Sequence, residues 1–161
     1  AFGKKYCGGG NEHIKANINL DAGVYVLYGG AWHINSTATV TGSGVTLFLT
    51  NGATLDINGG ASVDLSAPTS GTYSGLVIFF DRDFSGSSVI NGGANFSLVG
   101  AVYGTNTNLT FTGNTTGSLP GECTQIIGYT VAFTGNSDFN TDCSASGTKD
   151  IKTAQSIRIV E

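Results

Sequence analysis

The chain has 161 residues, of which 40% are hydrophobic and 11% are charged, and its formal net charge at pH 7 is −4. This length fits one domain with a single core, and the hydrophobic fraction excludes a disordered chain. The acidic balance excludes a nucleic-acid partner, because phosphate binding requires clustered lysine and arginine. No 18-residue apolar segment is present, so we expect no membrane span within this chain. Because no signal-like segment opens it, we expect any targeting signal or anchor to lie upstream or to have been removed.

A repeat of about 22 residues organises the sequence. Each repeat contains three short strand-like runs, and no stretch shows the 3.6-residue apolar period of a helix. One coil of a parallel β-helix needs this arrangement, because each coil lays its strands in register on the previous one. We therefore predict an all-β fold, a parallel β-helix of about five coils, right-handed by the usual preference of parallel crossovers. The repeats are marked by INSTA at 34–38, INGGA at 57–61 and 90–94, FTGNT at 111–115 and FTGNS at 133–137.

In chain order, the sequence predicts one domain with three parts. Residues 1–22 form an N-terminal cap or first coil, irregular over 4–19, residues 23–143 form the repeat coils, and residues 144–161 form a C-terminal tail. Alternation along each strand then assigns the side chains to an inner or an outer face. The predicted inward columns are Ile34, Ile57, Ile90, Phe111 and Phe133 on the second strands, and Ala38, Ala61 and Ala94 with Val40, Val63 and Phe96 on the third strands.

The first strand of each coil has apolar residues at consecutive positions, over 24–28, 45–49 and 76–80. A strand that is apolar on both faces is usually covered on both. The C-terminal segment 151–160 is one candidate cover, and an upstream segment or a partner subunit is the other. If nothing in the chain covers this face, it is the candidate interaction surface. Its predicted outward residues are Tyr25, Leu27, Phe48, Val77 and Phe79.

The three cysteines bear on the compartment of the protein. Cys123 and Cys143 bracket a 20-residue stretch, and we predict a disulfide between them, which implies an oxidising, extracytoplasmic setting. Cys7 is free, pairs outside the chain or competes for either partner. No CxxC pair is present, so we expect no structural zinc site. We also expect no other metal site and no cofactor.

The densest charge cluster is Asp81-Arg82-Asp83, directly after an apolar strand. Parallel β-helices often serve as polysaccharide lyases or hydrolases, which use paired carboxylates or a calcium-assisted basic residue. The alternative, which we favour, is a solvated turn, since the positions after Leu49 and Tyr103 in neighbouring coils carry no acid.

His33 and Asp56 fall in the same outward column of adjacent coils. A His–carboxylate catalytic pair needs a nucleophile beside it, and the sequence offers no evident serine or cysteine there. We therefore interpret the two residues as a surface ion pair, which contributes about 0–1 kcal/mol.

Four segments of the sequence resemble the C-terminal domain of TadG-like proteins of bacterial Flp (tight-adherence) pilus assembly systems. They are GVYVLYGG, TVTGSGVTLFLTNGATLDINGGASVDLSAPTSGTYSGLVIFFDRD, GAVYGTNTNLTFTGN and CTQIIGYTVAFTGNSDFNTDC. The similarity runs from about residue 6 to 143, and the SAPTSG…YSG loop followed by a strand and DR is its most specific part. The resemblance implies a secreted or periplasmic domain that normally follows an N-terminal membrane segment. It brings no catalytic residue that maps onto this chain.

These observations predict a non-catalytic extracytoplasmic module with a structural or interaction role in pilus assembly or surface attachment. Its partners would be pilus or cell-envelope proteins. The alternative is a carbohydrate-active or glycan-binding β-helix protein, either a lyase or hydrolase acting at Asp81, Arg82 and Asp83 or an adhesin without catalysis.

Overall fold

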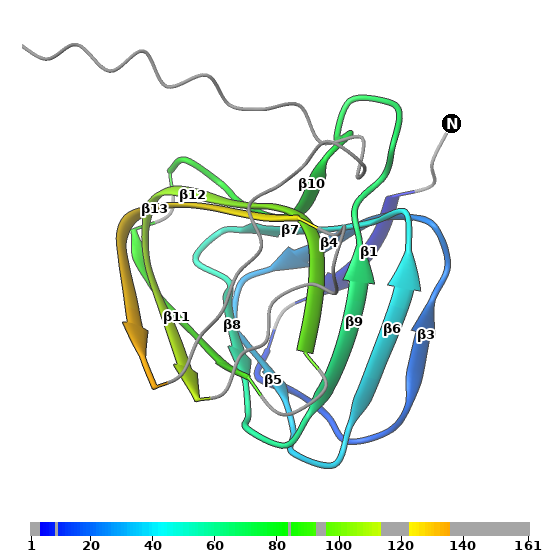
Figure 1. The fold of residues 1–161 in the computed structure, drawn as a ribbon. Helices are drawn as coiled ribbons and strands as arrows, with labels where there is room; N and C mark the ends of the chain where they lie inside the picture. Colours follow the sequence, from blue (N-terminus) through cyan, green and yellow to red (C-terminus); the bar gives the residue numbers. More distant parts are fainter. Residues whose placement is uncertain (1–3, 9, 84, 93–95, 114–122, 136–161) are drawn as a thin grey trace, which may run out of the picture.

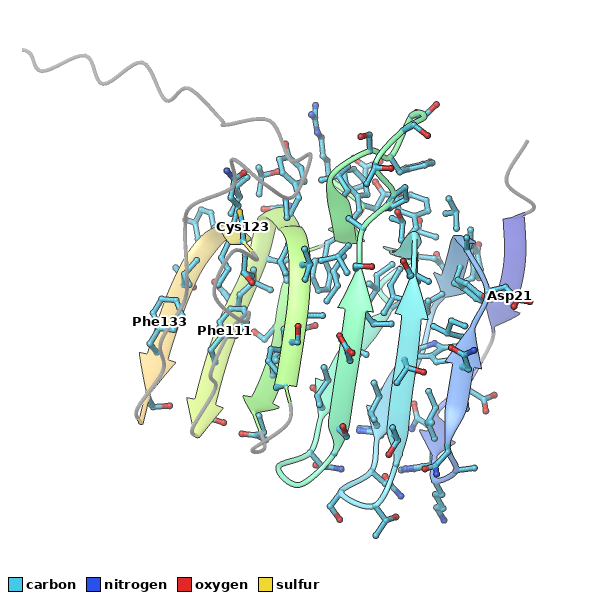
Figure 2. The ribbon with its side chains drawn as sticks, turned by 45° about the vertical axis from the view of Figure 1, so that its right-hand side comes forward. Asp21, Phe111, Cys123 and Phe133 are labelled. Carbon is cyan, nitrogen blue, oxygen red and sulfur yellow. The ribbon has the colours of Figure 1, made fainter. Side chains whose placement is uncertain are left out.

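The structure is a computed structural model that describes residues 4–8, 10–83, 85–92, 96–113 and 123–135. These residues contain strands and turns but no helix. The strands pair in parallel and stack as a β-solenoid of about five turns, which confirms the predicted fold class. Figure 1 shows the strands lying around one interior, and Figure 2 shows successive coils side by side from the first (blue) to the last (orange).

The chain visits three strand positions in each coil. At the first position, each strand pairs with the equivalent strand of the coil before and after it. These first-position strands are β1 (Lys4–Gly8), β4 (Gly23–Tyr28), β7 (Val45–Thr50), β10 (Leu76–Phe80), the middle of β12 (Phe96–Gly113) and the start of β13 (Thr124–Thr134).

The second and third positions repeat the same parallel pairing. The long β12 passes through all three positions, pairing with β9, β10 and β11 in turn. The remaining strands are β2 (Glu12–Ile14), β5 (Ala31–Ile34), β8 (Thr54–Ile57) and β11 (Gly86–Gly92) at the second position, and β3 (Ile18–Leu20), β6 (Thr39–Ser43) and β9 (Ser62–Ser66) at the third.

The predicted inward columns form the core. On the second strands, Ile34, Ile57, Ile90 and Phe111 are in register and buried, and Ile14 extends the column into the first coil. Val40, Val63 and Phe96 form the matching buried column on the third strands, beside the buried Ala38 and Ala61. Phe133 continues the column of the second strands but is 50% exposed. Ala94 lies outside the described residues.

The first coil is more regular than the sequence predicts. Residues 4–19 were expected to be irregular, yet β1, β2 and β3 pair in register with β4, β5 and β6. The segment lacks the INGGA motif, but the alternation of Ile14, Ile18 and Leu20 still lets it continue the apolar interior. The predicted tail 144–161 lies outside the described residues.

The turns after β5 and β8 both begin with asparagine. Asn35 and Asn58 donate their backbone N–H groups to the carbonyl oxygens of Ile14 and Ile34 in the preceding coil, at 2.9 Å in both cases. Their own carbonyl oxygens accept hydrogen bonds from the N–H groups that follow three residues later. These backbone hydrogen bonds join each coil to the one before it and close the turn, a kind of position in which asparagine is favoured.

Candidate functional site

The outer face of the first-position strands carries a row of aromatic side chains. Phe48 of β7, Phe79 of β10 and Tyr103 of β12 are in register across three coils. The ring centroids of Phe48 and Phe79 are 5.2 Å apart, and those of Phe79 and Tyr103 are 5.4 Å apart with an interplanar angle of 3°. All three side chains are half-buried. We call Phe48, Phe79 and Tyr103, with Tyr73 described next, the outer aromatic ladder.

A loop over residues 67–75 completes the ladder. The Gly75 N–H donates to the Pro68 carbonyl oxygen at 2.8 Å, which closes the loop on itself. The loop places the ring of Tyr73 with its centroid 6.4 Å from that of Phe48. The Thr46 hydroxyl donates to the Leu76 carbonyl oxygen at 2.8 Å and thereby ties β7 to the strand that follows the loop. The loop therefore supports one end of the aromatic row.

The geometry of the ladder decides which parts of the rings are free. Neighbouring strands lie about 4.8 Å apart, so equivalent aromatic side chains on successive coils come into contact. The rings of Phe79 and Tyr103 are parallel and cover each other's facing sides, whereas the Phe48 ring is tilted by 38° against that of Phe79. The outer ring edges form a ridge along the rod. Such a ridge presents apolar edges to a partner and has no open ring face between Phe79 and Tyr103.

Three of the five predicted interaction residues lie in the core instead. Tyr25 pairs with Leu47 and Leu27 pairs with Leu49, so both take inward positions, at 6% and 3% exposure. In a strand that is apolar at consecutive residues, alternation does not decide the register, and the prediction for these two residues was wrong.

Val77 is also buried, at 0% exposure, because β10 has an irregularity there. The register between β10 and β12 shifts between Leu76 and Ile78, so Val77 and Ile78 both enter the core. Phe48 and Phe79 alone keep the predicted outward positions. The expected cover, segment 151–160, lies outside the described residues.

The Asp81-Arg82-Asp83 turn is held by local hydrogen bonds. The Thr50 hydroxyl donates to Asp81 Oδ2 at 2.7 Å, and the Asp83 backbone N–H donates to Asp81 Oδ1 at 3.3 Å. The Thr50 hydrogen bond, with help from the backbone N–H groups, holds the pKa of Asp81 below its ordinary value. A general acid needs a raised pKa, so Asp81 is suited to accepting hydrogen bonds in a turn rather than donating a proton.

Arg82 links this turn to the aromatic ladder. Its guanidinium carbon lies 5.9 Å from the centroid of the Tyr103 ring, within the range of a cation–π contact. Its backbone carbonyl accepts a hydrogen bond from the Asn106 side-chain amide at 3.4 Å. Arg82 and Asp83 are both exposed, so the end of the ladder carries charge of both signs.

His33 and Asp56 share an outward column, as the sequence predicts. His33 Nδ1 lies 3.4 Å from Asp56 Oδ2, and His13 of the first coil stacks on His33 with ring centroids 4.8 Å apart. Sequence reasoning missed His13, because the first coil was not placed in register. In this column Val89 follows Asp56, so the described residues supply no nucleophile there.

Within the described part of the chain, no group of three or more His, Cys, Asp or Glu side chains could hold a metal ion. The same residues contain no helix that is long and apolar enough to cross a membrane.

Cys123 is fully buried at the start of the last described coil and is disulfide-bonded. The predicted partner, Cys143, lies outside the described residues, as does the side chain of Cys7. The pairing of Cys123 with Cys143 therefore stays a prediction.

Comparisons with family models, curated proteins and solved structures found no match to this chain. Any function must therefore be inferred from the residues and their geometry, and above all from the outer aromatic ladder. Sequence reasoning missed two of its four members, Tyr73 and Tyr103. Tyr103 could have been found by aligning GAVYG with the two preceding first strands, whereas Tyr73 depends on the conformation of a loop.

Proposed function

We propose that this domain is a non-catalytic, extracytoplasmic interaction module that works in pilus assembly or surface attachment. The observation that carries the proposal is the outer aromatic ladder, with Phe48, Phe79 and Tyr103 half-buried and in register on one outer face. Aromatic residues are enriched in the contact surfaces of proteins and depleted from surfaces that only face water. The ladder is therefore the contact surface of the proposal.

The stacking favours a protein partner over a sugar. Sugars bind aromatic side chains through the flat ring faces, and here the facing sides of Phe79 and Tyr103 are covered by each other. The exposed ring edges fit apolar side chains of another protein, and edge-to-face aromatic contacts add roughly 0.5–1.5 kcal/mol each. Arg82 and Asp83 at the end of the row supply a polar rim, as protein interfaces commonly have.

The compartment and the pilus setting have separate support. The disulfide at Cys123 is typical of oxidising compartments outside the cytoplasm. The assignment to pilus assembly rests on the resemblance to TadG-like proteins, whose most specific segment includes the loop that holds Tyr73 against Phe48. Partners among pilus or cell-envelope proteins follow from that resemblance.

A capture experiment with matched variants tests this proposal. The pure domain is immobilised and exposed to solubilised cell envelope, beside a Phe48→Ser/Phe79→Ser variant and a Tyr129→Ser variant. Tyr129 is 72% exposed and is not a member of the ladder; it lies in the last described coil, two residues after Ile127, which pairs with Tyr103. It controls for the loss of an exposed aromatic residue outside the row. We expect the wild type and Tyr129→Ser to retain the same pilus or envelope protein and the double variant to lose it. Equal capture by all three would contradict the proposal.

Glycan binding is the second candidate, and the exposed pair Arg82 and Asp83 beside Tyr103 favours it. Charged side chains next to an aromatic ring at the end of the row could hold the hydroxyl groups of a terminal sugar. The test is a panel of acidic and neutral polysaccharides, assayed for binding, for reducing ends and for unsaturated products, with and without calcium. Saturable binding that Arg82→Ala abolishes would favour this candidate, and product formation would restore the carbohydrate-active alternative.

A further inference from the structure

The interior of the solenoid is not filled at its N-terminal end. A cavity of about 270 Å³ lies between the first coil and the two that follow. Its walls come from all three strand positions, and its lining includes Ile14, Ile18 and Leu20 of the first coil and Tyr25, Trp32 and Val40 of the second. The columns that fill the later coils thus leave space where the rod begins.

Among the residues that the structure describes, the surface that lines this cavity is wholly apolar. The Tyr25 hydroxyl donates a hydrogen bond to the Asp21 carbonyl oxygen at 3.0 Å. Tyr25 therefore lines the cavity with its aromatic ring. Water needs two or more polar partners to stay in such a space, and among the described lining residues the Trp32 Nε1–H is the one buried side-chain polar group without a hydrogen-bond partner. A single donor is too few to retain water there. A charged group would also lose its hydration there, and no described lining residue carries a charge that could compensate it. The interior therefore selects hydrocarbon.

The size and position of the cavity narrow the ligand further. An apolar cavity of roughly 150 Å³ already accepts benzene, so this one has room for more carbon atoms. Ile14, Ile18 and Leu20 are only partly buried, which places the approach to the cavity at the first coil. Beside them, Glu12, Lys15 and Asp21 are exposed and can keep a polar head group in water.

We propose that the N-terminal end of the solenoid binds the alkyl chain of a neutral amphiphile. The chain enters between the strands of the first coil and occupies the apolar cavity, while the head group stays at the exposed rim. This site lies inside the rod and is separate from the outer aromatic ladder, so neither proposal depends on the other.

The chain has one tryptophan, and Trp32 lines the cavity, so its fluorescence reports binding directly. The probes are 1-butanol, 1-hexanol and 1-octanol, titrated into the wild-type protein, with sodium octanoate as the charged comparison. We expect saturable changes and an affinity that rises about four-fold per methylene group while the chain still fits. We also expect 1-octanol to raise the melting temperature and octanoate to bind more weakly. The absence of a saturable change with 1-octanol, or an affinity independent of chain length, would overturn the proposal.

A variant that fills the space gives an independent test. Ile18→Phe adds an aromatic ring at the wall of the cavity, and Leu20→Phe is the second version if the first does not fold. We expect 1-octanol to bind at least ten-fold more weakly to the filled variant. The control is Val131→Phe, which also introduces a phenylalanine but in the last described coil, at a residue that is 38% exposed. This variant should bind 1-octanol as the wild type does. Equal affinity of wild type and filled variant would show that 1-octanol binds elsewhere and would overturn the proposal.

Discussion

At the level of single residues, the hydrogen bond from Thr50 to Asp81 ties two neighbouring coils together. It joins the end of β7 to the turn after β10, at 2.7 Å, and the Asp81 backbone N–H donates to the Leu49 carbonyl oxygen at 2.8 Å beside it. The side chain that looked like a candidate acid in the sequence is thus engaged in holding the coil spacing.

Replacing Thr50 changes how stability depends on pH. Because the pKa of Asp81 is lower in the folded chain than its ordinary value of 3.8, its contribution is present above that pH and is lost as the pH falls through the folded value. In Thr50→Val we expect the pKa of Asp81 to rise toward 3.8, as measured by NMR titration of the carboxyl carbon. The stability difference from the wild type should shrink as the pH falls from neutral toward and below the ordinary pKa of an aspartate. Thr54→Val is the control, and an unchanged Asp81 pKa in Thr50→Val would contradict this account.

Two glycines separate the cost of backbone strain from the cost of crowding. Gly30 and Gly52 both have left-handed backbone, with φ of 72° and 75°. A Cβ at Gly30 would overlap the Gly10 carbonyl oxygen, whereas a Cβ at Gly52 would meet no atom within 4 Å. We expect Gly52→Ala to cost about 1 kcal/mol through strain alone, and Gly30→Ala to cost about 1–3 kcal/mol more through overpacking. Urea unfolding measures both losses of stability. Equal losses for the two variants would contradict the close approach of the Gly10 backbone to Gly30.

At the level of elements, an inward side chain is more deeply buried, and stabilises the fold more, when a coil lies on both sides of it. Ile57 lies between Ile34 and Ile90 and is 1% exposed, whereas Phe133 follows Phe111 and is 50% exposed. We expect Ile57→Ala to lower the free energy of unfolding by about 2–5 kcal/mol. Phe133→Ala should cost about 1 kcal/mol, although it removes the larger side chain. Chemical denaturation of both variants measures these losses. A larger loss of stability for Phe133→Ala would contradict the account that Ile57 lies inside its column and Phe133 at the exposed end.

The same columns explain what the sequence could predict. Second and third strands alternate apolar with polar residues, so Ile34, Ile57 and Ile90 could be placed in one column from the sequence alone. First strands lack that alternation, and their register depends on the turns before them, as in the pairing of Gly23 with Val45. Tyr25 and Leu27 were therefore assigned to the wrong face.

Local irregularity and loop conformation set the remaining limit. The shift at Val77 leaves no mark in the sequence LVIFF, so a regular strand was the natural prediction. The contact of Tyr73 with Phe48 joins two coils through a loop without repeat character. The candidate site was thus predictable at Phe48 and Phe79, where the strand repeat applies.

At the level of the whole molecule, the order of the strands separates the cysteines. Cys7 lies in β1 and Cys123 directly precedes β13, and the path β1–β4–β7–β10–β12–β13 joins them. Five strand spacings of about 4.8 Å put them about 24 Å apart, well beyond the roughly 7 Å between Cα atoms that a disulfide spans. Within one chain, Cys143 is therefore the partner that we expect for Cys123.

This pairing predicts different effects for the three cysteines. Cys143→Ser should lower the free energy of unfolding by about 3 kcal/mol, as expected for a closed loop of this length, and Cys123→Ser should do at least the same. Cys7→Ser should have little effect. Peptide mapping without reduction and chemical denaturation measure the bond and its contribution. A recovered peptide that links Cys7 to Cys123 would contradict the strand order.

The two proposed sites, the outer aromatic ladder and the apolar cavity, lie on different sides of the solenoid wall. The outer aromatic ladder runs along the outside of β7, β10 and β12, and the apolar cavity lies inside the first coils. Stacked coils make this separation possible, because inward and outward residues alternate along a strand. A partner on the outside and an alkyl chain on the inside can therefore be tested with variants that do not share residues.

The most direct test of the central claim is pilus display and surface attachment in the native host. Strains lacking the protein are complemented with the wild type, Phe79→Ser or Tyr129→Ser, each checked for equal amount and equal melting temperature. We predict that Phe79→Ser leaves both outputs near those of the deletion strain, while Tyr129→Ser restores them. Full restoration by Phe79→Ser would contradict the claim that the outer aromatic ladder is the working surface of this domain.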